Sequence, residues 1–177
     1  MQQLPTMKTQ LIFDLESTGL LRRGSRIHCI VMRDAIDSST HIFDHKPERD
    51  LLQGVKQLEQ AEVLIGHNII GYDIPLLKEQ YPEFAPTGQV LDTLVLSRCY
   101  HPDIIEIDKK RKWKQMPLQL YGRHSLESYG YRLGEYKGDF GKTSDWKEWS
   151  REMQDYMIQD VVVTTKLWNH FQPYLAG

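Results

Sequence analysis

Short hydrophobic runs, several of them alternating with polar positions, occur in five places along the chain and predict five β-strands. The first run ends in acidic residues, and the second and third are separated by a short polar turn. Because the first three runs follow one another closely, they predict a meander of three antiparallel strands. The predicted strands cover Gln10–Asp14, Arg26–Ile36, Ser39–His45, Glu62–Asn68 and the beginning of Gln89–Tyr100.

Other segments repeat their apolar residues at the spacing of an α-helix. After the third predicted strand, Leu51, Val55 and Leu58 recur at three- and four-residue intervals, and Pro47 suits a first helical turn. The resulting order, β-β-β-α-β-α-β-α, predicts a mixed α/β sheet in which a helical crossover places the fourth strand beside the first. The further predicted helices cover Ile74–Tyr81, the end of Gln89–Tyr100, Ser125–Gly134 and Asp145–Phe171.

The regular pattern breaks up between His101 and Gly122, where one stretch is strongly basic. Asp108–Gln115 reads DKKRKWKQ, with five lysine and arginine residues around Trp113. We predict an exposed loop here, and two roles remain open for it: a track for nucleic-acid phosphates, or an ordinary solvated charged face. We find no repeat or linker, so the length of 177 residues predicts a single domain over residues 1–177.

Composition argues against several classes of protein. The 22 basic and 24 acidic residues give a net charge of -2, which neither favours nor excludes nucleic-acid binding. The two cysteines, Cys29 and Cys99, lie far apart without metal-type spacing, which argues against a disulfide framework or a zinc site. No apolar stretch has the length of a signal peptide or a membrane span. We therefore expect a soluble cytoplasmic protein.

Two carboxylates stand one residue apart at the end of the first predicted strand. In the stretch LIFDLEST, Asp14 and Glu16 occupy positions i and i+2, which point to the same face of a strand. Like charges so close together are unfavourable unless a positive charge lies between them. Either the strand has ended and both acids are solvated, or the pair holds a divalent cation.

Two further acids belong to other predicted elements. Asp73 follows the fourth strand at the start of a helix, where it would interact with the helix dipole or, if the fourth strand lies beside the first, approach Asp14. Asp160 directly precedes three valines in the last helix, so its helix is buried there and the carboxylate needs a partner. A metal ion would satisfy that need, and so would an ion pair with Arg98 or Arg123.

Three short motifs combine these acids with an asparagine and a tyrosine. They are DLE with Asp14 and Glu16, NIIGYD with Asn68 and Asp73, and YMIQD with Tyr156 and Asp160. Together, and in this order, they resemble the motifs of the DnaQ-like 3′–5′ exonucleases in the Asp-Glu-Asp-Asp-Tyr (DEDDy) subgroup. The histidine subgroup would carry its histidine at the position of Asp155. The chain looks most like the proofreading domains of phage family A DNA polymerases.

This resemblance implies an RNase H-like fold and phosphodiester hydrolysis with two divalent ions, Mg2+ or Mn2+. It implies that Asp14 bridges both ions and that Asp73 serves the ion beside the leaving group. Glu16 and Asp160 would complete the ion that holds the attacking water. Tyr156 would orient that water through its hydroxyl, because a tyrosine with its ordinary pKa of about 10 is a poor base at neutral pH.

Four further positions are candidates for contact with the substrate. Thr18 would hydrogen-bond the terminal 3′-hydroxyl. Leu20 would wedge against the last base, as its family counterpart does, or pack like any leucine. Asn68 would contact the phosphate backbone or cap its loop. Phe140 would stack on a base, because aromatic faces accept any base, or it would anchor its loop.

The resulting hypothesis is a 3′–5′ exodeoxyribonuclease that releases nucleoside monophosphates from single-stranded or frayed DNA 3′ ends during phage DNA replication and proofreading. It would act in the host cytoplasm, alone or with a separate DNA polymerase subunit. An RNase D-like exoribonuclease shares the same four acids and tyrosine and is one alternative. The other is a catalytically silent module that binds nucleic acid or docks on a polymerase.

Overall fold

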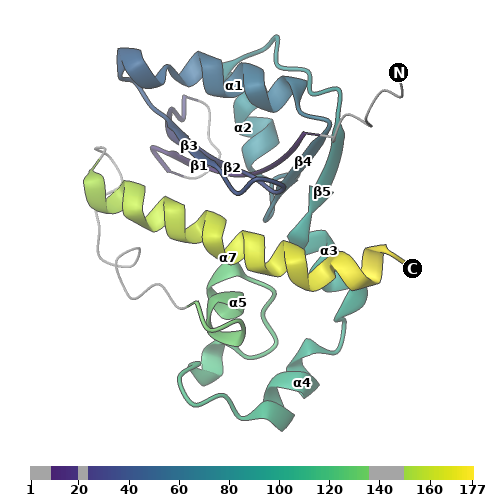
Figure 1. The fold of residues 1–177 in the computed structure, drawn as a ribbon. Helices are drawn as coiled ribbons and strands as arrows, with labels where there is room; N and C mark the ends of the chain where they lie inside the picture. The colour runs from purple at the N-terminus through teal and green to yellow at the C-terminus, as the bar shows by residue number, and fades with distance from the viewer. Residues whose placement is uncertain (1–8, 20–23, 136–149) are drawn as a thin grey trace.

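A mixed five-stranded sheet forms the centre of the protein. The computed structural model describes residues 9–19, 24–135 and 150–177. The strands are β1 (Gln10–Ser17), β2 (Ile27–Asp34), β3 (Thr40–Phe43), β4 (Val63–Gly66) and β5 (Gln89–Asp92). They lie in the order β3-β2-β1-β4-β5 (Figure 1). β1 pairs antiparallel with β2 and parallel with β4, so the predicted mixed sheet, with its fourth strand beside the first, is confirmed.

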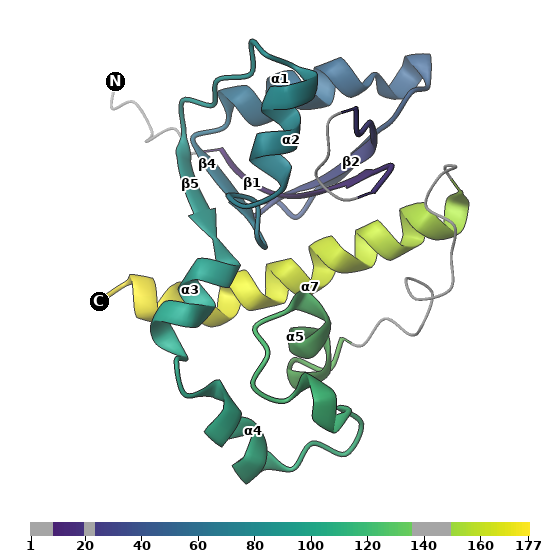
Figure 2. The same ribbon diagram turned by 180° about the vertical axis from the view of Figure 1, so that it is seen from behind.

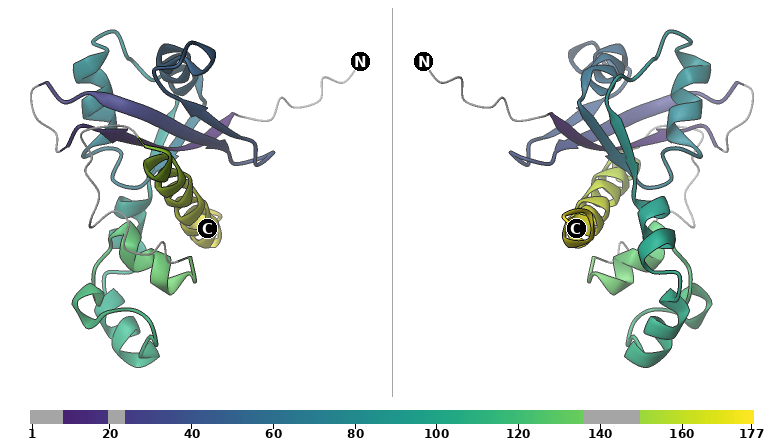
Figure 3. Two further views of the ribbon diagram at one scale, coloured as in Figure 1. Left: turned by 90° about the vertical axis from the view of Figure 1, so that its left-hand side faces the viewer. Right: turned by 90° about the vertical axis from the view of Figure 1, so that its right-hand side faces the viewer.

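Helices cover both faces of this sheet and extend beyond it. They are η1 (Pro47–Arg49), α1 (Leu51–Gln60), α2 (Asp73–Gln80), α3 (Thr93–Tyr100), α4 (Ile104–Arg111), η2 (Leu118–Leu120), α5 (Leu126–Arg132) and α7 (Arg151–Leu175). α1 and α2 lie over one face of the sheet and α7 crosses the other, as the side views in Figure 3 show. Beyond α7, residues 101–135 form a separate group of short helices, which we call the lobe (Figures 1 and 2). Within the described ranges, no helix combines the length and the apolar character needed to cross a membrane.

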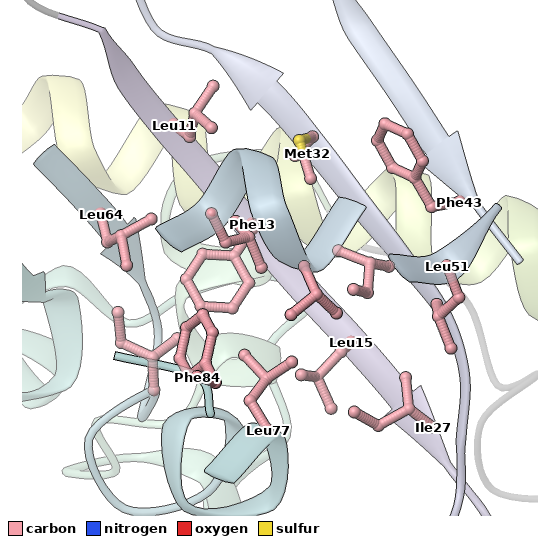
Figure 4. Packing of buried hydrophobic residues seen from close by; sticks show 14 of the residues in the cluster. Leu11, Phe13, Leu15, Ile27, Met32, Phe43, Leu51, Leu64, Leu77 and Phe84 are labelled. Atoms are coloured by element: carbon pink, nitrogen blue, oxygen red, sulfur yellow. The ribbon is translucent and has the colours of Figure 1, made fainter. Parts of the chain in front are cut away.

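The alternation of side chains along β1 divides the buried residues into two groups. Leu11, Phe13 and Leu15 point toward the layer of α1 and α2. There they pack in one buried cluster with residues such as Leu77 and Phe84 (Figure 4). Burial of each such side chain contributes about 1.5–3 kcal/mol, so this layer holds β1 firmly from one side.

The other side of β1 faces α7. Ile12 is buried there against Met157 of α7. Asp14 and Glu16 have the same parity as Ile12, so they also point toward α7, near the carboxyl end of the strand. We predicted that the strand ends at Asp14, but β1 continues to Ser17. Both acids therefore belong to regular strand and not to a solvated end.

The last helix agrees with its prediction in place but differs at its ends. The predicted helix covers Asp145–Phe171, whereas α7 runs from Arg151 to Leu175. Residues 145–149 lie outside the described residues. Ser150 caps the helix, because its Oγ accepts a hydrogen bond of 3.1 Å from the Met153 backbone N–H.

The basic stretch is where the structure differs most from the prediction. Asp108–Gln115 is not a loop throughout, because α4 continues to Arg111 and Asp108 is fully buried. The Asp108 carboxylate accepts hydrogen bonds from Arg132 Nε (2.9 Å) and Nη2 (2.7 Å), Trp113 Nε1 (2.9 Å) and the Gly122 backbone N–H (2.8 Å). Burial alone would raise the pKa of Asp108, but these bonds outweigh it and hold the pKa below its ordinary value. These partners lie 5 to 24 residues after Asp108, and the local sequence pattern does not indicate that they contact it.

We predict that Asp108→Asn strongly destabilises the protein, because it leaves the buried Arg132 guanidinium without its paired charge. Removing one partner of a buried ion pair costs about 3–5 kcal/mol. Urea unfolding of the wild type and of Asp108→Asn measures the difference in their free energy of unfolding. The control is Asp103→Asn at the other end of α4, where the side chain makes no capping hydrogen bond. It should change stability by less than about 0.5 kcal/mol. If Asp108→Asn lowered the free energy of unfolding as little as the control does, the prediction would be contradicted.

Candidate active site

Three carboxylates from two distant parts of the chain meet between the sheet and α7. Asp14 and Glu16 reach this point from β1, and Asp160 reaches it from the buried face of α7. One ligand oxygen from each of the three lies within 4.8 Å of the others, a spacing that could hold a metal ion. Carboxylate oxygens are the ligands that Mg2+ and Mn2+ prefer. The structure therefore brings together three of the four predicted acids.

Asp73 lies next to this group, in contact with the backbone of β1. It is the first residue of α2, it is buried, and its Oδ1 accepts a hydrogen bond of 3.3 Å from the Leu15 backbone N–H. Burial raises the pKa of Asp73 well above its ordinary value, and the negative charge of Asp14 raises it further. A bound cation would have the opposite effect on this carboxyl. The parallel pairing of β1 with β4 explains the approach, because the loop after β4 leads directly into α2.

Tyr156 has the expected helical register relative to Asp160. It lies one turn before Asp160 on α7 and is partly buried. Asp155, the position at which the histidine subgroup would carry its histidine, is exposed. The spacing of Tyr156 and Asp160 along α7 is therefore the one that the predicted tyrosine subgroup requires.

The loop between β4 and α2 is held by an acid that we did not predict. Asp92, at the end of β5, accepts backbone hydrogen bonds from Asn68 (2.8 Å), Ile70 (3.0 Å) and Leu94 (2.9 Å). Asn68 is exposed and has a positive φ of 61°. A Cβ at Gly71 would lie 2.6 Å from Asn68 Oδ1, so a larger residue there would displace the exposed Asn68 side chain. In the structure Asp92 also caps α3, but no local sequence pattern indicates its hydrogen bonds to the loop.

A second set of contacts fixes the chain just after Glu16. The Ser17 and Tyr72 hydroxyls lie 2.6 Å apart, and they lie 2.8 Å and 2.6 Å from the Gly19 carbonyl oxygen. Since each hydroxyl has one proton, two of these three contacts are hydrogen bonds at any one time. Thr18 is exposed, and its Oγ1 accepts a hydrogen bond of 3.0 Å from the Arg26 backbone N–H. The contact between Ser17 and Tyr72 joins the end of β1 to the residue that precedes Asp73. Two predicted substrate contacts, Leu20 and Phe140, lie outside the described residues.

Comparison with known proteins finds similarity in sequence and in fold. No family model matches the chain. The chain is 32% identical over 182 residues to a DNA-directed DNA polymerase of Enterobacteria phage T3, in an alignment that covers 89% of the chain and 26% of the polymerase. The chain thus spans about a quarter of the length of that relative.

Solved structures extend the comparison at the level of the fold. Brucella melitensis NrnC with bound Mg2+ has a TM-score of 0.62 and 19% identity, covering 98% of this chain and 78% of that one. Escherichia coli RNase D, an exoribonuclease, has a TM-score of 0.55 and 12% identity, covering 94% of this chain and 42% of that one.

The fold is RNase H-like, with a mixed sheet flanked by helices, and NrnC and RNase D share it. The sequence similarity confirms the predicted resemblance to phage DNA polymerases, over about a quarter of the length of such a polymerase.

We predict that Asp73→Asn stabilises the metal-free protein at neutral pH. Folding raises the Asp73 pKa, so the folded state holds a proton more tightly than the unfolded chain, whose pKa is about 3.9. Stability therefore falls as pH rises from about 4 through the folded pKa. Asparagine does not ionise, so it removes this pH-dependent loss of stability. Its side-chain oxygen can still accept the hydrogen bond from the Leu15 backbone N–H. Each kcal/mol gained raises Tm by about 2–4 °C.

Thermal melts in chelator, at mildly acidic and at neutral pH, measure the effect. The Tm of Asp73→Asn should exceed that of the wild type at neutral pH, and the difference should become smaller at acidic pH. Asp155→Asn, an exposed acid on α7, is the control and should melt with the pH dependence of the wild type. An Asp73→Asn variant that is less stable than the wild type at neutral pH would contradict the prediction.

Proposed function

We propose that the protein is a metal-dependent 3′–5′ exonuclease that acts on DNA and releases nucleoside monophosphates from the 3′ end. The observation that carries this proposal is the convergence of Asp14, Glu16 and Asp160, with Asp73 beside them. The similarity to a DNA polymerase of phage T3 favours DNA as the substrate. It also favours a role in phage replication and proofreading, which would place the protein in the host cytoplasm.

The donor atoms at the site fit two divalent ions, Mg2+ or Mn2+. All four acids offer hard carboxylate oxygens, and NrnC, which shares the fold, has been solved with Mg2+. Asp14 would contact both ions, and Asp73 would serve the ion nearer the leaving group. Glu16 and Asp160 would complete the other. Two such ions would supply an activated water and neutralise charge on the phosphate and the leaving 3′-oxygen.

The other predicted residues would orient the water and the substrate. Tyr156, one turn before Asp160 on α7, would position the attacking water by a hydrogen bond from its neutral hydroxyl. The Thr18 oxygen already accepts from the Arg26 N–H, and its own O–H can donate to the terminal 3′-hydroxyl of a strand. Asn68 is exposed on a loop held by its backbone, so its amide can reach a phosphate. Leu20 and Phe140 remain proposed contacts to bases.

A second candidate function is exoribonuclease activity. RNase D, which shares the fold, is an exoribonuclease, and the same acids would serve RNA hydrolysis. A third is a catalytically silent module that binds nucleic acid or docks on a polymerase. In the leading proposal, residues 1–177 form one exonuclease domain that works alone or beside a DNA polymerase subunit.

A gel time course on 5′-labelled single strands of DNA and RNA separates these functions. With Mg2+ or Mn2+ we expect DNA to shorten step by step from its 3′ end, and a chelator should stop the reaction. Faster shortening of RNA would favour the RNase D-like function. Binding of either strand without any metal-dependent product would overturn the exonuclease proposal and leave the silent module.

We predict that Asp14→Ala and Asp160→Ala each remove nearly all nuclease activity while the fold persists. Two like charges within 4.8 Å repel by roughly 3 kcal/mol at an effective dielectric constant of about 20. Deleting one should therefore leave the metal-free protein as stable as the wild type, or more stable. Asp155→Ala, an exposed neighbour on α7, is the matched control and should keep full activity. Rates with Mg2+ and melts in chelator test both parts, and retained activity combined with clear destabilisation would assign the acids a structural role.

We predict that Tyr156→Phe slows single-turnover hydrolysis by about 10- to 1000-fold at saturating Mg2+. The change keeps the packed ring and all four acids but deletes one hydrogen bond to the water. Substrate affinity should change little. Tyr174→Phe, a partly exposed tyrosine near the end of the same helix, should react at the wild-type rate. Equal rates for all three proteins would reduce Tyr156 to a packing residue.

A further inference from the structure

The lobe carries a run of cations that the proposed active site does not use. Lys109–Lys114 reads KKRKWK and holds five of the 22 basic residues of a chain with 24 acidic ones. All five cations are exposed. Lys109 pairs with Glu106 at 3.0 Å, but both side chains are more than half exposed, so this ion pair contributes little. The run is therefore a local concentration of accessible positive charge on an otherwise slightly acidic protein.

The helix dipole explains only part of this run. Lys109, Lys110 and Arg111 occupy the last turn of α4, where cations are favourable. Lys112 and Lys114 follow the helix. Lys112 adopts a left-handed conformation with φ of 50°, at a position where glycine or asparagine would be less strained. Helix stability gives no reason for lysine there.

The backbone of the run is anchored at both ends of its turn. Asp108, directly before it, is fixed by Arg132 and Gly122. Trp113, near its end, donates its indole N–H to the same Asp108 carboxylate at 2.9 Å, and the Arg111 guanidinium lies 5.6 Å from the centre of the indole ring. The cations therefore project from an ordered turn, and a ligand that binds them need not first order the backbone.

The same contacts tie the run to the helix that carries the catalytic candidates. Arg132, the partner of Asp108, is the last residue of α5. Tyr129 of α5 packs in one buried cluster with Val163 and Leu167 of α7. Just after α5, Glu135 forms an ion pair of 2.5 Å with Lys166 of α7. The position of the cations relative to α7 is thus fixed by packing.

We propose that Lys109–Lys114 is a second nucleic-acid contact, which binds backbone phosphates of a single strand whose 3′ end occupies the carboxylate site. The inference rests on the proposed function for the location of the 3′ end. Phosphodiester oxygens are the chemistry that five clustered cations recognise, and they are common to DNA and RNA. Trp113 anchors the turn and does not stack on a base. The contact holds long strands and contributes nothing to a strand too short to reach from the carboxylates to the lobe.

The test compares two variants that change the net charge equally. One replaces Lys110, Lys112 and Lys114 with glutamine and spares the two cations that contact other side chains of the chain. The control replaces three exposed lysines on the α1 and α2 side of the sheet, Lys46, Lys56 and Lys78. Fluorescence anisotropy in chelator measures the binding of oligo-dT and oligo-U strands of about 4 and about 20 nucleotides over a range of salt concentrations.

The lobe variant should bind the long strands about 10- to 100-fold more weakly at low salt, for DNA and RNA alike. Its plot of log affinity against log salt should be shallower by about 2, because each single-strand phosphate that the variant no longer neutralises reduces the slope by about 0.7. Its affinity for the short strands and its Tm should match the wild type. The control should keep the wild-type slope.

Equal slopes for the two triple variants, or no change in the lobe variant, would overturn the proposal and leave the run as a solvated face. A loss of affinity limited to DNA or to RNA would also overturn it, because backbone phosphates do not distinguish the two. Binding in chelator needs no hydrolysis, so this result stands even if the wild type proves to have no nuclease activity.

Discussion

Repulsion between carboxylates is the constraint around which the rest of the structure is arranged. Asp14, Glu16 and Asp160 offer oxygens within 4.8 Å of one another, and Asp73 is buried beside them with a strongly raised pKa. Such a group opposes folding unless cations or protons offset its charge. The surrounding structure therefore supplies the stability that the acids do not. Buried residues from β1 and α7 pack directly next to them.

Each acid is held by a different kind of contact. Regular strand places Asp14 and Glu16 on one face, opposite the apolar layer that Figure 4 shows. Helix packing places Asp160, and a backbone hydrogen bond from Leu15 holds Asp73. Farther out, Asp92 fastens the loop after β4, and the hydroxyls of Ser17 and Tyr72 join the end of β1 to the start of α2. The geometry of the acids therefore depends on several separate contacts.

The lobe extends this rigid framework beyond the sheet. The buried Asp108 gathers α4, the turn at Gly122 and α5 around one carboxylate, and α5 in turn packs on α7. An ion pair buried in this way contributes more to a defined shape than to net stability. The defined shape is what gives the neighbouring lysines a fixed position relative to the acids. The acidic site and the basic run thus belong to one connected set of helices.

The sequence by itself determined the five strands, the helices that cover the sheet and their order, but not α4, because helical and strand periods are local properties of a chain. The i and i+2 spacing of Asp14 and Glu16 and the i and i+4 spacing of Tyr156 and Asp160 were enough to put each pair on one face. Only the tertiary structure brought the two faces together, because the sequence separation gives no distance. It also decided the roles of Asp92 and Asp108, whose partners lie up to 24 residues away. By sequence, Asp92 lies between a predicted strand and a predicted helix, and Asp108 lies in a predicted loop. A buried carboxylate is recognised by what surrounds it in space and not by its neighbours in sequence.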